Sequence, residues 1–277
     1  MIVDSHCHAW RRWPYQPPVP DPASRALAEN LLWEMDRHGV ERACVVCARI
    51  DDNPDNNDYV ADCVGRYPDR LIQLADVDCS WSPEYHTPGA AERLERAVDR
   101  YRLRGFTHYV KADDDGGWYR SEEGLAFFGK AAELGQIASI AAPARFEPVV
   151  RELAARFPRL VILRHHMAGA RVDDRATLEA ILPSAQLPNV HVKLSGFHYA
   201  SPVPWAFPYP DCRPIAQALF DAFGPERLHW GSDYPVCQLR AMTYQQSLEA
   251  VRTHCDFIPP AAMARVLGDS LNELLGR

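Results

Sequence analysis

The chain has 277 residues, of which 47% are hydrophobic and 24% are charged, so it holds enough apolar material for a folded core and is not a disordered chain. Its 37 acidic and 30 basic side chains give a net charge of -7, and the basic residues form no cluster interleaved with aromatic residues. This pattern argues against nucleic acid as a partner and favours a small-molecule substrate.

No apolar run reaches the roughly 20 residues that a membrane-spanning helix needs, and the residues after Met1 do not resemble a signal peptide, so we expect a cytoplasmic protein without a membrane partner. The eight cysteines are scattered singly, as expected of reduced thiols. Cys44 and Cys47 form a C-x-x-C inside an apolar, strand-like run, where buried thiols are favoured over a metal or redox site. The sequence assigns no surface to self-association, so a homo-oligomer stays open.

Short apolar runs rich in β-formers alternate with longer helical patterns along the chain, which is typical of repeated βα units and a parallel sheet. The predicted strands are residues 2–4, 42–48, 71–77, 105–111, 136–141, 160–164, 189–194 and 227–231. The predicted helices are residues 23–38, 58–67, 90–101, 121–134, 147–157, 175–184, 214–223, 244–253 and 260–275. Eight strands in one series predict an α/β fold, a (β/α)₈ TIM barrel formed by residues 1–277 as a single domain.

Two histidines directly follow the first predicted strand. His6 and His8 are two residues apart, and residues at that spacing point to the same side of an extended chain. Both imidazoles can therefore face one point at the mouth of a barrel. There they could bind a metal ion, or orient a substrate carbonyl without one.

The loops after the first and seventh strands interrupt the regular spacing. Residues 10–22 and 197–210 are rich in proline and aromatic residues, and Trp10 and Tyr199 lie within them. Loops that follow barrel strands stand on the catalytic face, so these two residues are candidates for binding substrate. The alternative is that their aromatic side chains only pack on the rim of the barrel.

Polar residues also lie within or at the end of three further strands. His165 and His166 end the sixth strand, and one of them should point toward the mouth, although strand alternation alone does not decide which. Lys111, at the end of the fourth strand, could bind an anionic group or polarise a carbonyl. For Lys193 in the seventh strand, a role in the site and a structural pairing with a carboxylate on a neighbouring strand are equally good interpretations.

Asp233 directly follows the eighth strand. Because the first and eighth strands are neighbours in a closed barrel, its carboxylate should meet His6 and His8. A carboxylate in that position can take a proton from an attacking water. The competing interpretation is that Asp233 caps the helix that follows.

Four sequence motifs together resemble those of the amidohydrolase superfamily. The resemblance is strongest to its lactonase-like branch, which contains sugar-lactone, pyrone-dicarboxylate lactone and sulfomuconolactone hydrolases. The resemblance spans almost the whole chain, and its most specific parts follow strands seven and eight. The motifs are Asp4, His6, His8 and Trp10 around the first strand, a histidine after the sixth, Val192 to Gly196 in the seventh, and Trp230 to Cys237 after the eighth.

This resemblance implies a barrel hydrolase that opens a lactone to a hydroxy acid. Asp233 would activate water, and His165 would join the site as the third imidazole. One divalent metal ion, zinc or manganese, could be held by His6, His8, His165 and Asp233, or the histidines could polarise the lactone carbonyl without metal.

The chain also departs from the family pattern. Binuclear members carry a histidine after the fifth strand, where this sequence has Ala141 and Ala142, which argues against a two-metal site. Thr107 and Lys111 differ from the residues found in many sugar lactonases. Lys111, Arg145 and the aromatic loops suggest an anionic lactone instead.

Two other functions remain open at this point. A metal-dependent non-oxidative decarboxylase of aromatic or unsaturated acids shares the first-strand histidines and the eighth-strand aspartate, although Val236 and Cys237 after Asp233 are more typical of lactonases. A barrel that binds a metabolite without catalysis is the other alternative.

Overall fold

The computed structural model describes residues 1–276 and confirms the predicted (β/α)₈ TIM barrel. Neighbouring strands pair in parallel from the first to the eighth, and a parallel bridge between Cys7 and Tyr234 joins the segment after the eighth strand to the first. The strands are β1 (Val3–Cys7), β2 (Arg42–Val46), β3 (Leu71–Asp76), β4 (Gly105–Tyr109), β5 (Ile137–Ala141), β6 (Val161–Arg164), β7 (Val190–Leu194) and β8 (Leu228–Trp230).

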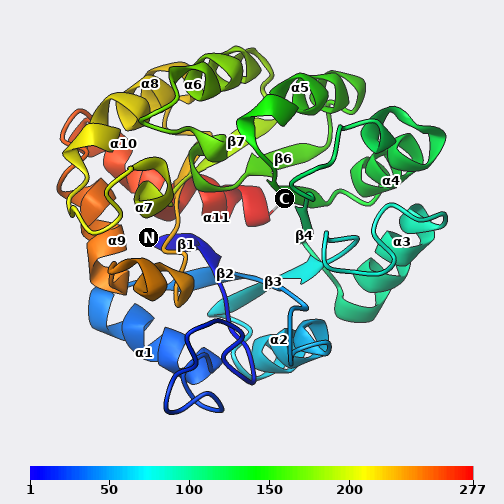
Figure 1. The fold of residues 1–277 in the computed structure, drawn as a ribbon, viewed down its shortest axis with the longest axis horizontal. Helices are drawn as coiled ribbons and strands as arrows, with labels where there is room; N and C mark the ends of the chain where they lie inside the picture. Colours follow the sequence, from blue (N-terminus) through cyan, green and yellow to red (C-terminus); the bar gives the residue numbers. More distant parts are fainter. Residues whose placement is uncertain (277) are drawn as a thin grey trace.

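Helices surround this sheet, as Figure 1 shows. Within residues 1–276, no helix is long and apolar enough to cross a membrane. The helices are α1 (Ala28–His38), α2 (Asn56–Arg66), α3 (Ala90–Tyr101), α4 (Glu122–Glu133), α5 (Glu147–Arg156), α6 (Arg175–Ile181), α7 (Phe197–Ala200), α8 (Arg213–Phe223), α9 (Tyr244–Arg252), α10 (Pro260–Ala264) and α11 (Ser270–Leu275).

The strands bury side chains on both faces, which explains why they read as continuous apolar runs. In β2, Cys44 and Val46 pack inside the barrel, whereas Val45 and the following Cys47 pack toward the outer helices. The two thiols of the C-x-x-C therefore lie on opposite faces of the sheet and cannot share a ligand. All eight cysteines are buried and free, as predicted.

The first strand is longer than predicted. Sequence pattern places it at residues 2–4, but β1 continues to Cys7, and its pairing with β2 shifts register between Asp4 and Cys7. Such an irregularity changes which side chains face inward. Val3 packs inside the barrel, and three residues later His6 also points inward.

The predicted final helix, residues 260–275, is interrupted. A π-helical turn, Arg265–Asp269, separates α10 from α11 because Gly268 presses against the start of β1. A Cβ atom at Gly268 would lie 2.4 Å from the backbone nitrogen of Val3. The break lets α11 turn under the barrel, where Leu271 and Leu274 pack on the inward-facing residues of the strands. This helix, drawn in red near the centre of the ring in Figure 1, forms the floor of the barrel.

Candidate active site

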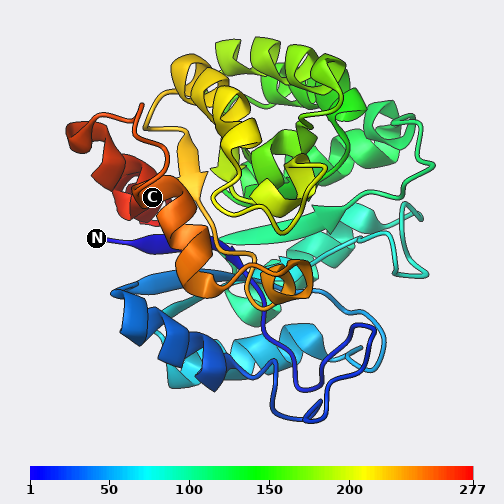
Figure 2. The same cartoon turned by 60° about the vertical axis from the view of Figure 1, so that its left-hand side comes forward.

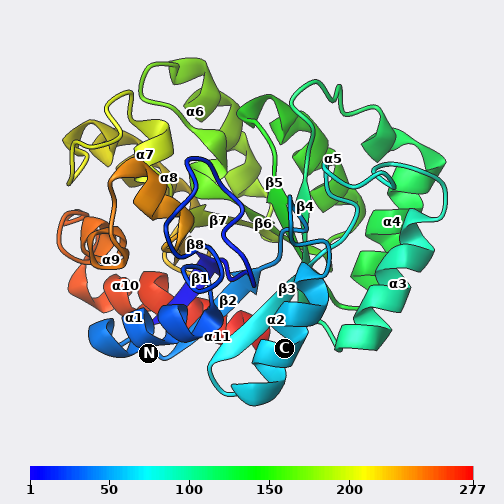
Figure 3. The same ribbon diagram turned by 60° about the horizontal axis from the view of Figure 1, so that its bottom comes forward.

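A cavity of about 390 Å³ opens at the mouth of the barrel, where the strands end. In Figure 2, β1 starts beside the N-terminus at the left and runs into the molecule, toward the loop that follows it. Figure 3 shows the long segment after β1, in dark blue, beside the strand ends. The cavity is lined by His8, Tyr15, Tyr109, Ala141, Ala142, His165, His166, Gly169, Ala170, Arg171, Tyr199, Asp233 and Val236.

Asp233 lies at the centre of a ring of histidines, and its carboxylate is almost completely buried. Oxygen Oδ1 is 3.3 Å from His6 Nε2, 3.5 Å from His8 Nε2 and 3.7 Å from His166 Nε2. Thus the structure brings together residues that are more than two hundred positions apart in the sequence.

The second carboxylate oxygen of Asp233 has its own partners. The Tyr199 hydroxyl donates a hydrogen bond of 2.8 Å to Oδ2, and His198 Nε2 lies 3.6 Å from it. Both residues come from α7 in the aromatic loop after β7. The aromatic loop therefore contributes directly to the site.

Backbone contacts fix the position of Asp233. Its φ is +60°, in the left-handed region, and its backbone N–H donates to the carbonyl of His6 at 2.7 Å. The buried Asp4 carboxylate accepts hydrogen bonds from the backbone and the hydroxyl of Ser232. Burial raises the pKa of Asp4 to about 6 against the effect of these hydrogen bonds. Asp4 thus ties the segment after β8 to β1.

The hydrogen bonds of His8 leave one lone pair facing the site. Its Nδ1 lies 2.7 Å from the carbonyl of Val46, which can only accept, so Nδ1 carries the hydrogen and Nε2 is an acceptor. This Nε2 is 3.1 Å from His6 Nε2. Trp10 stacks on the His8 ring at a centroid distance of 4.9 Å and lies behind it, outside the cavity lining.

Lys193 lies beneath the histidines inside the barrel and is fully buried. Its Nζ is 2.9 Å from His6 Nδ1 and 2.8 Å from the Ser139 hydroxyl. Its partners in the barrel are thus an imidazole and a hydroxyl, and burial lowers the pKa of Lys193 to about 7.

Both histidines after β6 reach the mouth. His165 Nε2 lies 2.7 Å from the Ser139 hydroxyl. His166 adopts a φ of +45°, which takes it out of strand alternation, and its Nδ1 lies 3.0 Å from the Ser195 hydroxyl. Gly196 leaves room for the His166 ring, because a Cβ there would lie 2.7 Å from its Cβ.

The hydrogen-bond chain from Lys193 fixes the tautomer of His165. Because Lys193 donates to the Ser139 oxygen, the Ser139 hydroxyl is free to donate a hydrogen bond to His165 Nε2, which leaves the hydrogen of the neutral ring on Nδ1. Within residues 1–276 this buried Nδ1 has no hydrogen-bond partner. An unpaired donor on a ring that lines the cavity suits a developing oxyanion.

The electrostatics favour an ionised Asp233 carboxylate. Burial opposes ionisation of Asp233, but the surrounding imidazoles, His166 above all, hold its pKa well below the usual range. Burial lowers the pKa of His6 and, to about 4, that of His166. At neutral pH the carboxylate can therefore accept a proton.

Sequence reasoning overlooked three residues of the site. Tyr15 and Tyr109 line the cavity, and His198 faces Asp233. His198 lies within the predicted aromatic loop, and Tyr15 lies within the loop after β1. The unusual composition of these two loops is the sequence feature that could have identified both residues.

Besides Trp10, two more predicted substrate-binding residues, Lys111 and Arg145, do not line the cavity. Lys111 is exposed, with its Nζ 4.8 Å from the ring centre of Tyr85. Arg145 is also exposed and donates to the backbone carbonyls of Ala112 and Asp114. Both belong to segments that turn outward after β4 and β5.

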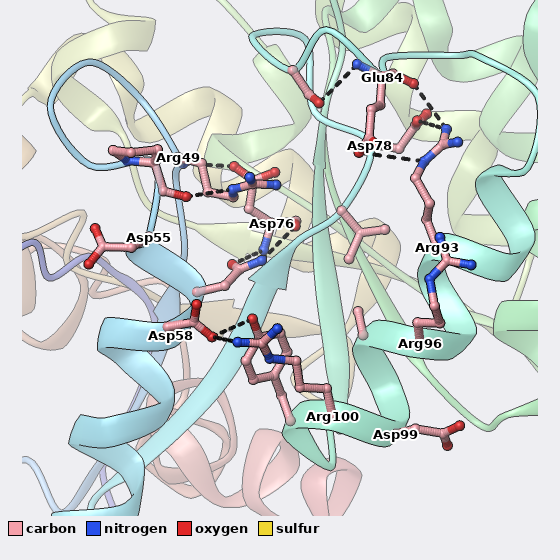
Figure 4. A pocket seen from close by; sticks show the side chains of 16 residues that line it. Arg49, Asp55, Asp58, Asp76, Asp78, Glu84, Arg93, Arg96, Asp99 and Arg100 are labelled. Atoms are coloured by element: carbon pink, nitrogen blue, oxygen red, sulfur yellow. Dashed lines mark hydrogen bonds and ion pairs between the residues drawn. The ribbon is translucent and has the colours of Figure 1, made fainter.

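A larger cavity, of about 800 Å³, lies outside the barrel near α2 and α3 (Figure 4). Its charged side chains neutralise each other: Arg93 pairs with Asp78 at 2.8 Å, and Arg100 pairs with Asp58 at 2.6 Å. No histidine lines it. Size alone therefore does not identify the reactive site.

A carboxylate surrounded by imidazoles at the carboxyl ends of a (β/α)₈ barrel defines the class of a barrel enzyme with acid–base chemistry. The amidohydrolase family model matches residues 3–276, so the chain belongs to the amidohydrolase family and is a hydrolase of that family.

Two curated relatives are L-fucono-1,5-lactonases. The lactonase of Burkholderia multivorans is 32% identical over 265 residues, covering 87% of this chain and 84% of that protein. The lactonase of Burkholderia ambifaria is 38% identical over 135 residues, but this match spans only 45% of this chain and 44% of that protein.

Solved structures share the fold at lower identity. An amidohydrolase from Burkholderia multivorans with bound zinc has a TM-score of 0.78 at 22% identity, and a probable 2-pyrone-4,6-dicarboxylic acid hydrolase from Acinetobacter baumannii has 0.76 at 17%; each match covers 100% of this chain and 99% of the other. A 5-carboxyvanillate decarboxylase from Sphingomonas paucimobilis has a TM-score of 0.68 at 17% identity, covering 99% and 98%.

Proposed function

We propose that this protein hydrolyses a small lactone to a hydroxy acid, with Asp233 as the base that activates water. The observation that carries the proposal is the buried, ionised Asp233 carboxylate beside an open cavity of about 390 Å³. The lactonase relatives, one of which matches over most of its length, support a lactone as the substrate class.

The residues can perform each proton transfer of lactone hydrolysis. Asp233 takes a proton from water while the water oxygen bonds to the carbonyl carbon, and the His165 Nδ1–H stabilises the oxygen that becomes negative. The ring C–O bond then breaks, and the proton passes from Asp233 to the departing ring oxygen. Tyr199 orients the carboxylate through its 2.8 Å hydrogen bond.

The donor set fits one divalent metal ion. His8 Nε2 and Asp233 Oδ1 are both acceptors, yet they lie 3.5 Å apart, an arrangement that a cation between them would stabilise. His6, His8 and Asp233 would hold the ion, and the carbonyl of Val46 behind His8 is a typical partner of a metal-bound imidazole. When bound, zinc or manganese would polarise the carbonyl and acidify the attacking water. Hydrolysis without metal is the alternative.

The cavity favours a neutral lactone over a dicarboxylate. Arg171 is the basic side chain in its lining, and this guanidinium already pairs with Asp173 at 2.9 Å. Lys111 and Arg145, on which the prediction of an anionic substrate was based, do not line the cavity. Hydroxyl-bearing 1,5-lactones are therefore the first substrates to assay, with 2-pyrone-4,6-dicarboxylate as the anionic comparison.

The deciding experiment compares Asp233→Asn with the unmodified protein on a lactone panel, with acid release followed by pH indicator. Because the amide cannot accept a proton, we expect a loss of about 10²- to 10⁴-fold in kcat/KM with an unchanged circular dichroism spectrum. Asp211→Asn, at a half-buried aspartate outside the cavity lining, is the control. Unchanged turnover in Asp233→Asn would disprove the proposed base, and release of carbon dioxide from a carboxylated aromatic would favour the decarboxylase.

Repeating the assay in the presence of a chelator tests the metal. Loss of activity that zinc or manganese restores would support the ion at His6, His8 and Asp233. Full activity in protein shown to be metal-free would instead support direct polarisation by His165.

A further inference from the structure

A second group of histidines lies on the other side of the barrel wall. His108 and Tyr109 are adjacent in β4, so their side chains point to opposite faces of the strand. Tyr109 lines the mouth cavity, whereas the fully buried His108 packs near Phe127 and Phe128 of α4. A ligand at His108 would therefore be separated from Asp233 by the strand itself.

Three side chains from separate segments converge there. His86, in the loop before α3, places its Nε2 3.5 Å from His108 Nε2 and 4.0 Å from an oxygen of Asp78, which follows β3. One donor atom from each of these residues lies within 4.8 Å of the other two. Two imidazoles and a carboxylate form a ligand set that zinc commonly takes in proteins.

The hydrogen bonds of both imidazoles leave lone pairs facing each other. His86 Nδ1 lies 3.2 Å from a carboxylate oxygen of Asp114, and His108 Nδ1 lies 3.4 Å from the carbonyl of Val77. Both partners only accept, so each Nδ1 carries the hydrogen and each neutral ring has a lone pair on Nε2. Two such acceptors 3.5 Å apart favour a cation between them.

We propose that Asp78, His86 and His108 form a zinc site outside the catalytic cavity, which ties the loop after β3 to β4. Zinc–nitrogen bonds of about 2.0–2.1 Å place two tetrahedral ligands about 3.3–3.4 Å apart, close to the separation of the two Nε2 atoms. The Asp78 oxygen needs to approach His86 by roughly half an ångström to fit the same geometry.

The surroundings hold these ligands in place. The His86 ring is stacked between Tyr85 and Trp118, at centroid distances of 3.7 and 3.9 Å. The Asp114 carboxylate behind His86 is the kind of partner that orients metal-bound imidazoles. The Tyr119 hydroxyl, 2.9 Å from His108 Nε2, can donate a hydrogen bond to this nitrogen and helps to hold the ring in place.

Arg93 leaves one oxygen of Asp78 available to the ion. Its guanidinium pairs with Oδ1 at 2.8 Å, as Figure 4 shows, while Oδ2 faces His86, accepts one hydrogen bond from its backbone N–H at 3.1 Å and keeps a second lone pair. The site goes beyond the proposed lactonase reaction, because none of its three ligands lines the mouth cavity.

Zinc content of the full chain tests this site. Protein is stripped with chelator, equilibrated with zinc sulfate, desalted and analysed by mass spectrometry for metal. We expect His86→Gln to hold about one zinc ion per chain less than the unmodified protein. His254→Gln, at an exposed histidine, should hold as much as the unmodified protein, and Asp233→Asn should keep the ion that His86→Gln loses.

Two further measurements keep the test independent of folding defects. In Asp233→Asn, where the mouth site lacks its carboxylate, zinc should raise the melting temperature, and adding His86→Gln to that variant should abolish the rise. The lactone turnover of His86→Gln alone should be unchanged. Crystals soaked in zinc should show an anomalous peak among the three ligands. Equal zinc content in His86→Gln and the unmodified protein, or no anomalous peak at His86, would overturn the proposal.

Discussion

At the scale of single residues, Tyr199 has the clearest expected effect on chemistry, because its hydroxyl donates directly to Asp233. Removing the hydroxyl in Tyr199→Phe frees the carboxylate to turn and deprives it of a donor to a charged group. We expect kcat/KM to fall by about 10- to 100-fold, since a hydrogen bond to a charged group contributes about 1.5–3 kcal/mol.

Tyr209→Phe is the matched control for this prediction. Tyr209 is also buried, but its hydroxyl donates to the carbonyl of Pro204 at 2.7 Å, outside the mouth cavity. Steady-state kinetics of both variants on one lactone would measure the difference. Similar losses in the two variants would mean that Tyr199 acts only through packing.

At the scale of elements, the contact of Gly268 with β1 predicts a loss of stability without a loss of chemistry. In Gly268→Ala the added Cβ would clash with the backbone of Met1 and Val3. We expect the free energy of unfolding to fall by about 1–3 kcal/mol, the usual result of overpacking. Urea denaturation followed by tryptophan fluorescence measures it.

Gly276→Ala provides the comparison, because a Cβ there would meet its nearest neighbour at an ordinary 3.5 Å. Its unfolding midpoint should match that of the unmodified protein. If Gly268→Ala were equally stable, the approach of this turn to β1 would have to be looser than described.

The sequence predicts regular elements well and irregular ones poorly. Alternating apolar runs and helical patterns locate all eight strands because these patterns are local. The register shift in β1, which turns His6 inward, depends on pairing with β2 and is invisible in the pattern. The left-handed turn at His166 and the short helix that carries His198 likewise depend on packing at the mouth.

At the scale of the whole molecule, Lys193 places an ammonium group in the barrel interior at a cost in stability. Its pKa in the fold is about 7, against an ordinary 10.5, so folding releases a proton between these values. Its contribution to stability is thus full above about pH 10.5 and is lost as the pH falls through 7. Lys193→Met should raise the free energy of unfolding at pH 7 by about 1–3 kcal/mol.

The sign of the pH dependence makes this prediction specific. The advantage of Lys193→Met over the unmodified protein should shrink as the pH rises from 7 toward 10, whereas Lys111→Met, at an exposed lysine, should show little change. Urea midpoints measured across that range in chelator test it. An advantage that is constant with pH would rule out the buried ammonium as its source.

The floor made by α11 also bears on the order in which the molecule is completed during synthesis. The strand β8, which closes the wall, leaves the ribosome before α11 does, so the wall can form while its interior is still open to water from below. The inward-facing residues Val3, Ile72 and Leu163 gain their partners Leu271 and Leu274 only once α11 has been made. A nascent barrel would therefore expose apolar surface to chaperones until α11 is made.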